Sequence, residues 1–170
     1  MNSFRLSYSG WALNRELQIV QADVVLEIDG RSVVEEPLCV DVGMPALIWS
    51  ATRDIEPDRF APPDRWERAP FFVCGCGDPE CRAYPFAVRH RGNKVILAEL
   101  EQADAGQTPR EADEFEVDLK AYRAEVERTA RQFLAFIGGH ADYRPLYSDT
   151  VAKVQEGLAA LEALDVESDG

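Results

Sequence analysis

The chain has 170 residues, the length of one ordinary domain that buries roughly two-thirds of the surface its unfolded form would expose. Its composition, with 46% hydrophobic and 29% charged residues, is typical of a soluble globular protein and excludes a disordered or membrane-embedded chain. Eighteen Lys and Arg residues against 31 Asp and Glu give a net charge of -13, which argues against binding to nucleic acid or to an anionic membrane.

The first half of the chain is predicted to form strands, a short helix and a loop. Residues 4–11 alternate apolar and polar side chains, as a half-buried strand does. Residues 22–36 contain two apolar runs separated by Asp-Gly, which predicts a hairpin because both turn residues tolerate positive φ. Residues 44–54 favour a helix with proline in its first turn, and residues 55–69, which contain three prolines, are predicted to form an ordered loop.

More strands are predicted in the second half. Residues 71–74 form a short apolar run, and residues 83–100 are typical of a hairpin with Gly92-Asn93 as its turn. Residues 115–119 add a further strand. Because these strands follow one another through short turns, they predict an antiparallel or mixed sheet built from hairpins.

Two helices are predicted at the C-terminal end. Asp118 caps the first, whose apolar residues recur every three and four positions up to Ile137 before two glycines end it. The second runs from a Ser148 cap to Leu164, and residues 165–170 are predicted to be a frayed acidic tail. The sequence therefore predicts one α+β domain over residues 1–164, with both helices packed on one face of the sheet.

Three of the four cysteines lie within the stretch "FFVCGCGDPECRAYP". Cys74 and Cys76 would point to the same side of an extended chain, and Cys81 follows after a turn formed by Gly-Asp-Pro-Glu. Three thiols are thereby expected to converge. A structural zinc site needs four ligands, and the strand after the motif supplies a histidine. The predicted metal ligands are Cys74, Cys76, Cys81 and His90, with Cys39 and His140 as further options for the fourth.

Two other interpretations of the cysteines remain open. Zinc sites usually separate paired cysteines by two or more residues, whereas one residue separates Cys74 from Cys76. The cysteines could instead be small buried groups lining a glycine-rich turn. They could also form a thiol-redox centre in which Arg82 or His90 lowers the pKa of a thiol.

The segment "FFVCGCGDPECRA" resembles a motif of uncharacterised families of small bacterial proteins, in which an apolar strand leads into Cys-x-Cys-Gly, a short turn and a third cysteine. The early "EIDGRSV" hairpin and the helix that opens near "FEVDLKAYRAEVERTARQFL" agree with this resemblance. It implies the α+β element order described above and no particular activity. Arg82 and Ala83 stand where the motif would have a small residue and a glycine.

The negative charge is concentrated between Ala98 and Leu119, where eight acidic residues accompany one arginine. Complementary charge speeds association with a basic protein. We therefore expect a non-enzymatic protein-binding module, similar to the immunity or antitoxin proteins that bacteria make against basic toxins. A zinc-binding protein is the alternative, and a thiol-redox enzyme is a third. The residues predicted to bind the partner are Trp66, Glu111, Asp113, Glu114 and Glu116.

The absence of several sequence motifs argues against some classes of function. The chain has no nucleotide-binding glycine loop, no Gly-x-Ser-x-Gly elbow and no zinc-protease helix motif, which favours a non-enzymatic role. No apolar run approaches the roughly 20 residues needed to span a bilayer. The first ten residues lack the basic and apolar parts of a signal peptide, so we expect a cytoplasmic protein.

Overall fold

The computed structural model describes residues 3–61, 65–73, 83–101, 106–147 and 149–168. The strands within them are β1 (Phe4–Asn14), β2 (Ile19–Ile28), β3 (Arg31–Cys39), β4 (Phe72–Val73), β5 (Ala83–Tyr84), β6 (Phe86–Arg91), β7 (Lys94–Glu101) and β8 (Arg110–Asp118). The helices are α1 (Met44–Trp49), the short 3-10 helix η1 (Trp66–Arg68), α2 (Leu119–Gly138) and α3 (Thr150–Ser168).

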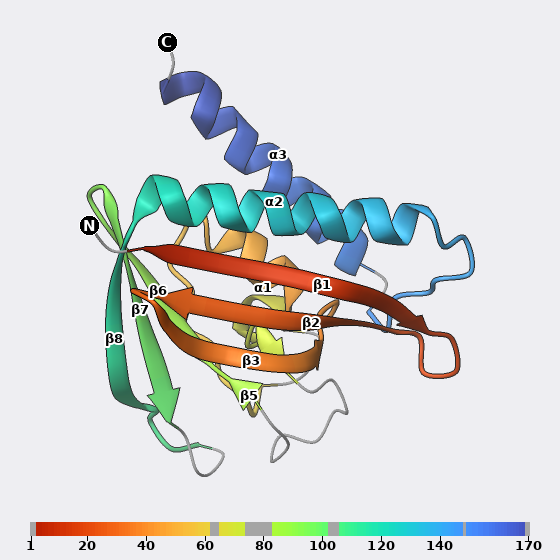
Figure 1. Cartoon of the computed structure of the whole chain (residues 1–170), viewed down its shortest axis with the longest axis horizontal. Coiled ribbons are helices and arrows are strands. Elements are labelled where there is room, and N and C mark those ends of the chain that lie inside the picture. The colour runs from red at the N-terminus through yellow and green to blue at the C-terminus, as the bar shows by residue number, and fades with distance from the viewer. Residues whose placement is uncertain (1–2, 62–64, 74–82, 102–105, 148, 169–170) are drawn as a thin grey trace.

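The strands form two antiparallel sheets. The larger sheet has the order β1-β2-β3-β4-β5, and the smaller has the order β6-β7-β8. Figure 1 shows the smaller sheet at the left-hand end of the molecule, while β1, β2 and β3 extend from there to the right. Neighbours in each sheet are consecutive along the chain, although α1 and η1 lie between β3 and its neighbour β4.

Both predicted hairpins are confirmed, and their turns use residues suited to left-handed backbone. Asp29 and Gly30 have φ values of 53° and 78°, and they connect the paired residues Ile28 and Arg31. Gly92 has a φ of 63° between β6 and β7. Glycine adopts this conformation without the steric penalty that a Cβ atom brings, so these turns set the register of the strands locally.

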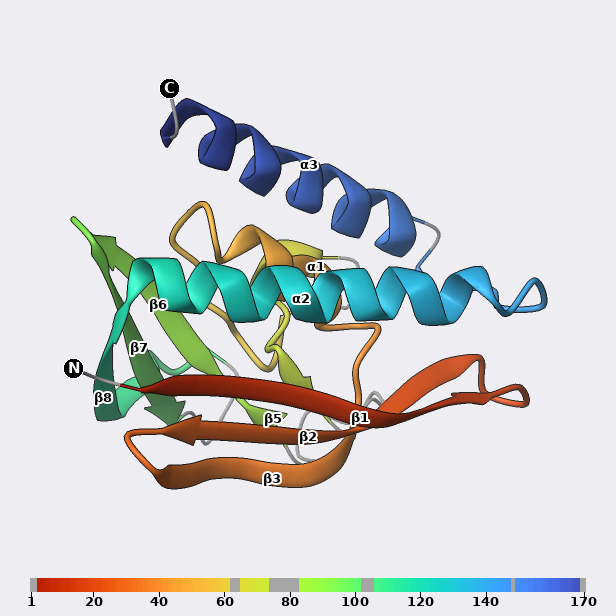
Figure 2. The same ribbon diagram turned by 45° about the horizontal axis from the view of Figure 1, so that its top comes forward.

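Helix α2 lies along β1 (Figures 1 and 2) and closes one side of the hydrophobic core. The predicted cap is confirmed, because the Asp118 carboxylate accepts a hydrogen bond of 3.0 Å from the backbone N–H of Ala121. Apolar side chains spaced three and four residues apart face the sheets and are fully buried. They are Tyr122, Val126, Ala130 and Phe133.

Helix α3 packs against α1 and also contacts α2. Gly157 allows the close approach to α1, since a Cβ atom built there would lie 2.8 Å from a methyl carbon of Ile48 and 3.2 Å from the Trp49 ring. A larger side chain at position 157 would push the two helices apart.

The predicted α+β class, with hairpin-built antiparallel sheets and two C-terminal helices, is confirmed. Some boundaries differ. Strand β8 begins at Arg110 rather than near residue 115. The prediction missed its first residues because they are polar and lie on an exposed edge, without the alternation of a half-buried strand. Helix α1 ends at Trp49 rather than near residue 54, and α3 continues to Ser168, beyond the predicted end at Leu164. The predicted cap Ser148 lies outside the described residues.

Candidate partner-binding surface

Strand β8 is an edge strand whose acidic side chains are exposed. It pairs with β7 on one side, and within the described ranges no strand pairs with its other side. An edge strand presents backbone N–H and C=O groups that another chain can use. The structure brings four of the predicted partner-binding residues together on this exposed strand, namely Glu111, Asp113, Glu114 and Glu116.

The pairing of β7 with β8 determines which way these carboxylates point. Phe115 and Val117 lie opposite Leu97 and Val95 on the core side of the sheet. Because side chains alternate along a strand, Glu114 and Glu116 point to the other face. The register shifts between Ala98 and Leu100, and a bulge of this kind redirects the side chains that follow it. The four acids are therefore presented on both faces of one strand.

Two arginines neutralise part of this charge. Arg89 of β6 lies 2.8 Å from a carboxylate oxygen of Glu56 and 2.5 Å from one of Glu111. Hydrogen bonds to Glu56 and then Glu111 raise the pKa of the Arg89 guanidinium, since both stabilise its charged form. Arg31 lies 3.9 Å from a carboxylate oxygen of Asp113. One arginine shared by two carboxylates leaves a net negative charge at this edge.

Crowding of negative charge persists beside β8. The pKa of Glu99 on β7 is raised, first because burial disfavours its charged form and then because Asp113 and Glu101 repel it, with Arg31 acting in the opposite direction. Glu114 makes no ion pair with any residue that the structure describes. A cation brought to this edge would therefore meet carboxylates whose charge the protein itself does not fully compensate.

The structure places Trp66 away from β8. It lies in η1, where its ring packs against Trp49 of α1 with the ring centres 6.0 Å apart. The guanidinium of Arg53 and the ammonium of Lys153 also lie over the Trp66 ring. The predicted partner-binding residues thus fall into two places: four on one sheet edge, and Trp66 in an aromatic cluster between α1 and α3.

The metal site predicted from the cysteine motif lies mostly outside the described residues, which include none of Cys74, Cys76 and Cys81. His90 is described, and its Nε2 lies 2.8 Å from the carbonyl oxygen of Ser50. A carbonyl can only accept, so Nε2 carries the proton and donates it, and the lone pair of the ring that could bind a metal is then on Nδ1. No group of three or more His, Cys, Asp or Glu side chains suited to a metal occurs in the part of the chain that the structure describes.

The fourth cysteine lies next to the start of the motif, which the sequence did not reveal. Cys39 ends β3, is 4% exposed and is the register partner of Val73, the residue that precedes Cys74 in the chain. Val73 in turn pairs with Ala83 on β5. Paired residues project their side chains on the same side of a sheet, so Cys39 shares a side with Val73. Cys39 and Val73 become neighbours through the pairing of two strands that are more than thirty positions apart in the chain. No local sequence pattern predicts such a pairing.

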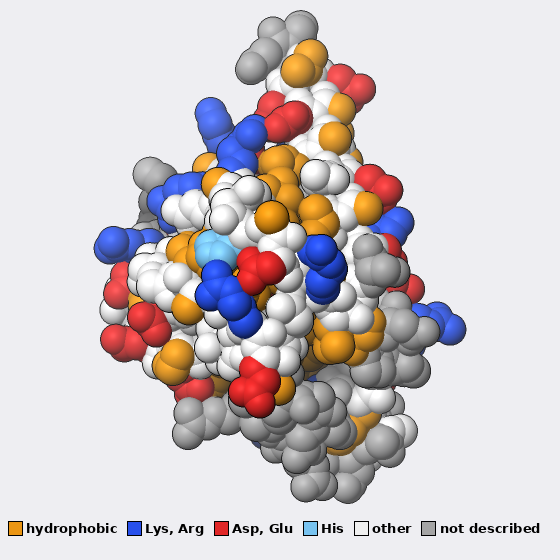
Figure 3. All heavy atoms as spheres, turned by 90° about the vertical axis from the view of Figure 1, so that its right-hand side faces the viewer, with side chains coloured by type: hydrophobic (Ala, Val, Ile, Leu, Met, Phe, Trp, Pro, Cys, Tyr) orange, Lys and Arg blue, Asp and Glu red, His pale blue; other side chains and the backbone are white. Residues whose placement is uncertain are grey.

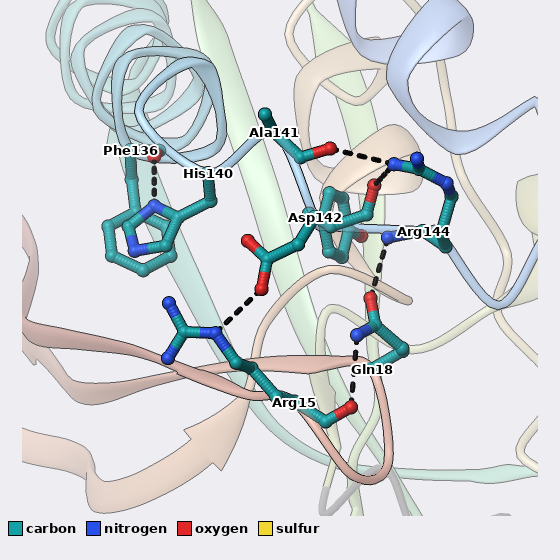
Figure 4. A network of polar contacts seen from close by, with 8 residues as sticks. Arg15, Gln18, Phe136, His140, Ala141, Asp142 and Arg144 are labelled. Atoms are coloured by element: carbon teal, nitrogen blue, oxygen red, sulfur yellow. Dashed lines mark hydrogen bonds and ion pairs between the residues drawn. The ribbon is translucent and has the colours of Figure 1, made fainter.

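A polar network occupies the opposite end of the molecule, where the β1–β2 hairpin meets the α2–α3 loop (Figure 4). Arg15 lies 2.6 Å from a carboxylate oxygen of Asp142, and this hydrogen bond lowers the pKa of Asp142. The side-chain oxygen of Gln18 accepts a hydrogen bond of 2.6 Å from the backbone N–H of Arg144. Figure 3 shows acidic, basic and hydrophobic side chains interspersed on this end. The network holds the loop on the hairpin and does not form a surface of one charge.

A small void lies in the core between described residues. Its volume is about 10 Å³, which is room for about one water molecule and not for an organic ligand. Apolar and aromatic side chains surround it, including Leu26, Leu97 and Tyr122. No helix among the described residues is long and apolar enough to cross a membrane.

Comparisons of the chain with protein-family models, with curated proteins and with solved structures find no match.

Proposed function

We propose that this protein is a non-enzymatic binding module of the immunity or antitoxin kind, acting in the cytoplasm, and that its acidic edge strand β8 receives a basic protein partner. One observation carries the proposal: four acidic side chains lie exposed on a strand, one edge of which no described strand pairs with. Such an edge can accept an extended segment through backbone hydrogen bonds, while the carboxylates select basic side chains.

Electrostatics support a basic partner. The chain has a net charge of -13, and Glu114 has no ion-pair partner among the described residues. The raised pKa of Glu99 has repulsion by Asp113 and Glu101 among its causes. A Lys or Arg side chain placed between these carboxylates would relieve that repulsion. Complementary charge of this kind mainly increases the association rate, and salt screens it.

The test uses a probe peptide as long as β8, with Lys at every second position, and measures its affinity by calorimetry or fluorescence anisotropy. In the test variant, Glu111→Gln, Asp113→Asn, Glu114→Gln and Glu116→Gln are combined. We expect its affinity to fall about thirtyfold, because four exposed charge contacts of roughly 0.5 kcal/mol each sum to about 2 kcal/mol. Raising the salt concentration should weaken wild-type binding and change the variant much less.

A matched control removes the same charge elsewhere on the surface. It combines substitutions of four exposed acids outside β8: Glu16→Gln, Glu162→Gln, Asp165→Asn and Glu167→Gln. We expect the control to bind the peptide nearly as well as the wild type does. Equal weakening in both variants would mean that the peptide responds to net charge alone, and the β8 proposal would then be wrong.

A zinc-binding protein is the second candidate, and the position of Cys39 favours it. Its register partner Val73 directly precedes Cys74 in the chain, so a fourth thiol lies beside the entrance to the motif. Cys39 is therefore a candidate for the fourth ligand beside His90, whose Nδ1 keeps its lone pair while its Nε2 donates to Ser50. A thiol-redox centre is the remaining alternative for the same cysteines.

Elemental analysis of the purified chain, combined with a count of reactive thiols, separates these alternatives. A zinc protein would contain about one zinc per chain and would lose it in Cys81→Ser, with a lower melting temperature after chelation. Loss of the metal in Cys39→Ser as well would identify Cys39 as the fourth ligand. A redox centre would contain no metal and one unusually reactive thiol. If the protein contains neither zinc nor an unusually reactive thiol, the cysteines would be small buried residues that pack in the turn.

A further inference from the structure

A second surface of opposite character lies around two tryptophans. The guanidinium carbon of Arg53 lies 4.5 Å from the ring centre of Trp49 and 5.1 Å from that of Trp66. The two rings are 6.0 Å apart and inclined by 39°. Arg53 therefore sits over both indoles, within the range in which a cation is attracted to an aromatic face.

The surrounding structure holds this aromatic pair in place. The indole N–H of Trp49 donates a hydrogen bond of 3.0 Å to the backbone carbonyl of Lys153 on α3. The absence of a side chain at Gly157 brings α3 directly against the Trp49 ring. The ammonium of Lys153 lies 6.0 Å from the ring centre of Trp66. Two cations from different elements thus converge on one half-buried tryptophan.

Arg53 forms no ion pair with the acids that the structure describes, whereas several other arginines do. Arg15, Arg89 and Arg131 each make an ion pair of 2.6 Å or less. No ion pair joins Arg53 to any acid among the described residues, although the protein carries 31 acidic side chains. Its guanidinium is exposed and held against two rings.

Acids close to Arg53 in the chain, and Glu156 on α3, have other partners. Asp54 accepts a hydrogen bond of 2.8 Å from the backbone N–H of His90. Glu56 is paired with Arg89, and Glu156 on α3 is paired with Lys153 over 3.1 Å. The available carboxylates are therefore engaged by β6 and α3, and the N–H groups of Arg53 remain for a group from outside the chain.

We propose that Arg53, Trp49 and Trp66 form a binding site for a carboxylate carried by an apolar peptide segment of a partner protein. The guanidinium lies over both rings, and no described residue accepts a hydrogen bond from its N–H groups, which match the geometry of a carboxylate. The Trp66 ring offers apolar surface for the neighbouring side chain of that segment. This site is separate from β8 and is independent of the function proposed for that strand.

A carboxylate fits this site better than nucleic acid. A phosphate backbone brings many negative charges, and a protein of net charge -13 repels them. A segment with one carboxylate flanked by apolar residues meets the guanidinium without that cost. The ligand class is therefore an acidic residue between hydrophobic ones.

The probe is the capped peptide acetyl-Leu-Asp-Phe-amide, titrated while the indole N–H signals of the tryptophans are followed by NMR. We expect saturable shifts of the Trp49 and Trp66 signals. The uncharged counterpart with Asn in place of Asp should bind about tenfold more weakly, since hydrogen bonds between charged groups contribute that much.

Arg53→Gln should weaken binding of the Asp peptide about tenfold and leave the Asn peptide unaffected. Arg5→Gln is the matched control, because Arg5 is equally cationic and 74% exposed in its side chain but lies on β1. Both substitutions are at exposed positions, so the fold should be retained, as circular dichroism can verify. The proposal is overturned if the peptide causes no shift at about 10 mM, if Asp and Asn peptides bind equally, or if Arg53→Gln and Arg5→Gln behave alike. Tighter binding of an oligothymidylate than of the peptide would also overturn it.

Discussion

The hydroxyl of Tyr143 donates a hydrogen bond of 3.0 Å to Oδ2 of Asp41, and this contact ties the α2–α3 loop to the loop between β3 and α1. Asp41 is 2% exposed, and its Oδ1 has no hydrogen-bond partner in the described part of the chain. Burial raises the pKa of Asp41, against hydrogen bonds that act to lower it. The fold therefore contains a buried carboxylate supported by one side-chain hydrogen bond.

Asp41→Asn should change how stability depends on pH. A carboxylate whose folded pKa is raised favours the folded state while protonated, and this contribution is lost as the pH rises through the raised pKa. The variant does not titrate there. Its stability relative to wild type should therefore increase from about pH 4 towards neutral pH. Urea unfolding at several pH values measures this trend, and a flat difference would show that Asp41 has an ordinary pKa.

Asp142→Asn should show the opposite trend. The hydrogen bond from Arg15 lowers the pKa of Asp142, so its contribution is present above the ordinary pKa of about 3.9 and is lost as the pH falls further. The variant should therefore lose stability relative to wild type as the pH rises through the acidic range. The effect should be small because both partners are largely exposed, and it should shrink in high salt. The same trend in Arg15→Gln would identify the ion pair as its cause.

Tyr143→Phe should destabilise the protein by about 1–3 kcal/mol at neutral pH, because it removes the hydroxyl and leaves the buried carboxylate of Asp41 without its side-chain donor. Chemical denaturation measures the change. The cost should be smaller when Tyr143→Phe is made in an Asp41→Asn background, where no charge is left behind. Equal costs in the two backgrounds would contradict a direct coupling between the two residues.

Gly43→Ala should destabilise the fold by about 3 kcal/mol or more, because overpacking against backbone cannot be relieved by a side-chain movement. A Cβ atom at this position would lie 2.5 Å from the carbonyl oxygen of Phe71 and 2.7 Å from that of Pro70. Gly138→Ala is the matched control, since nothing lies within 4 Å of a Cβ atom built at this helical position. We expect the control to be neutral or slightly stabilising in thermal unfolding. A tolerated Gly43→Ala would mean that the loop carrying Phe71 can move away.

Glu114→Thr combined with Glu116→Thr should promote self-association through β8. Charged side chains on an edge strand prevent pairing with a second copy, and threonine keeps the strand while removing that protection. Size-exclusion chromatography over a range of concentrations measures the change. Asp23→Thr with Glu27→Thr removes the same charge from β2, which has neighbours on both sides, and should stay unchanged. Association of both variants would point to net charge and not to the edge.

Local sequence patterns were enough to predict the hairpins and the first C-terminal helix. Asp29-Gly30 and Gly92 are turn residues whose backbone preferences act within a few positions, and Asp118 caps α2 through a residue three positions away. The polar start of β8 was missed, because an exposed edge strand does not need the alternation that marks a half-buried one.

Elements with local signals, namely the turns, the cap and the apolar periodicity of α2, can be predicted from the amino-acid sequence. It also determined the excess of negative charge. Folding is needed to place four of the acids on an edge that no described strand pairs with, to bring Cys39 beside Val73, and to set Arg53 over Trp49 and Trp66. The physical reason is that these relationships depend on strand pairing and helix packing between distant segments, which the side-chain pattern of any one segment does not encode.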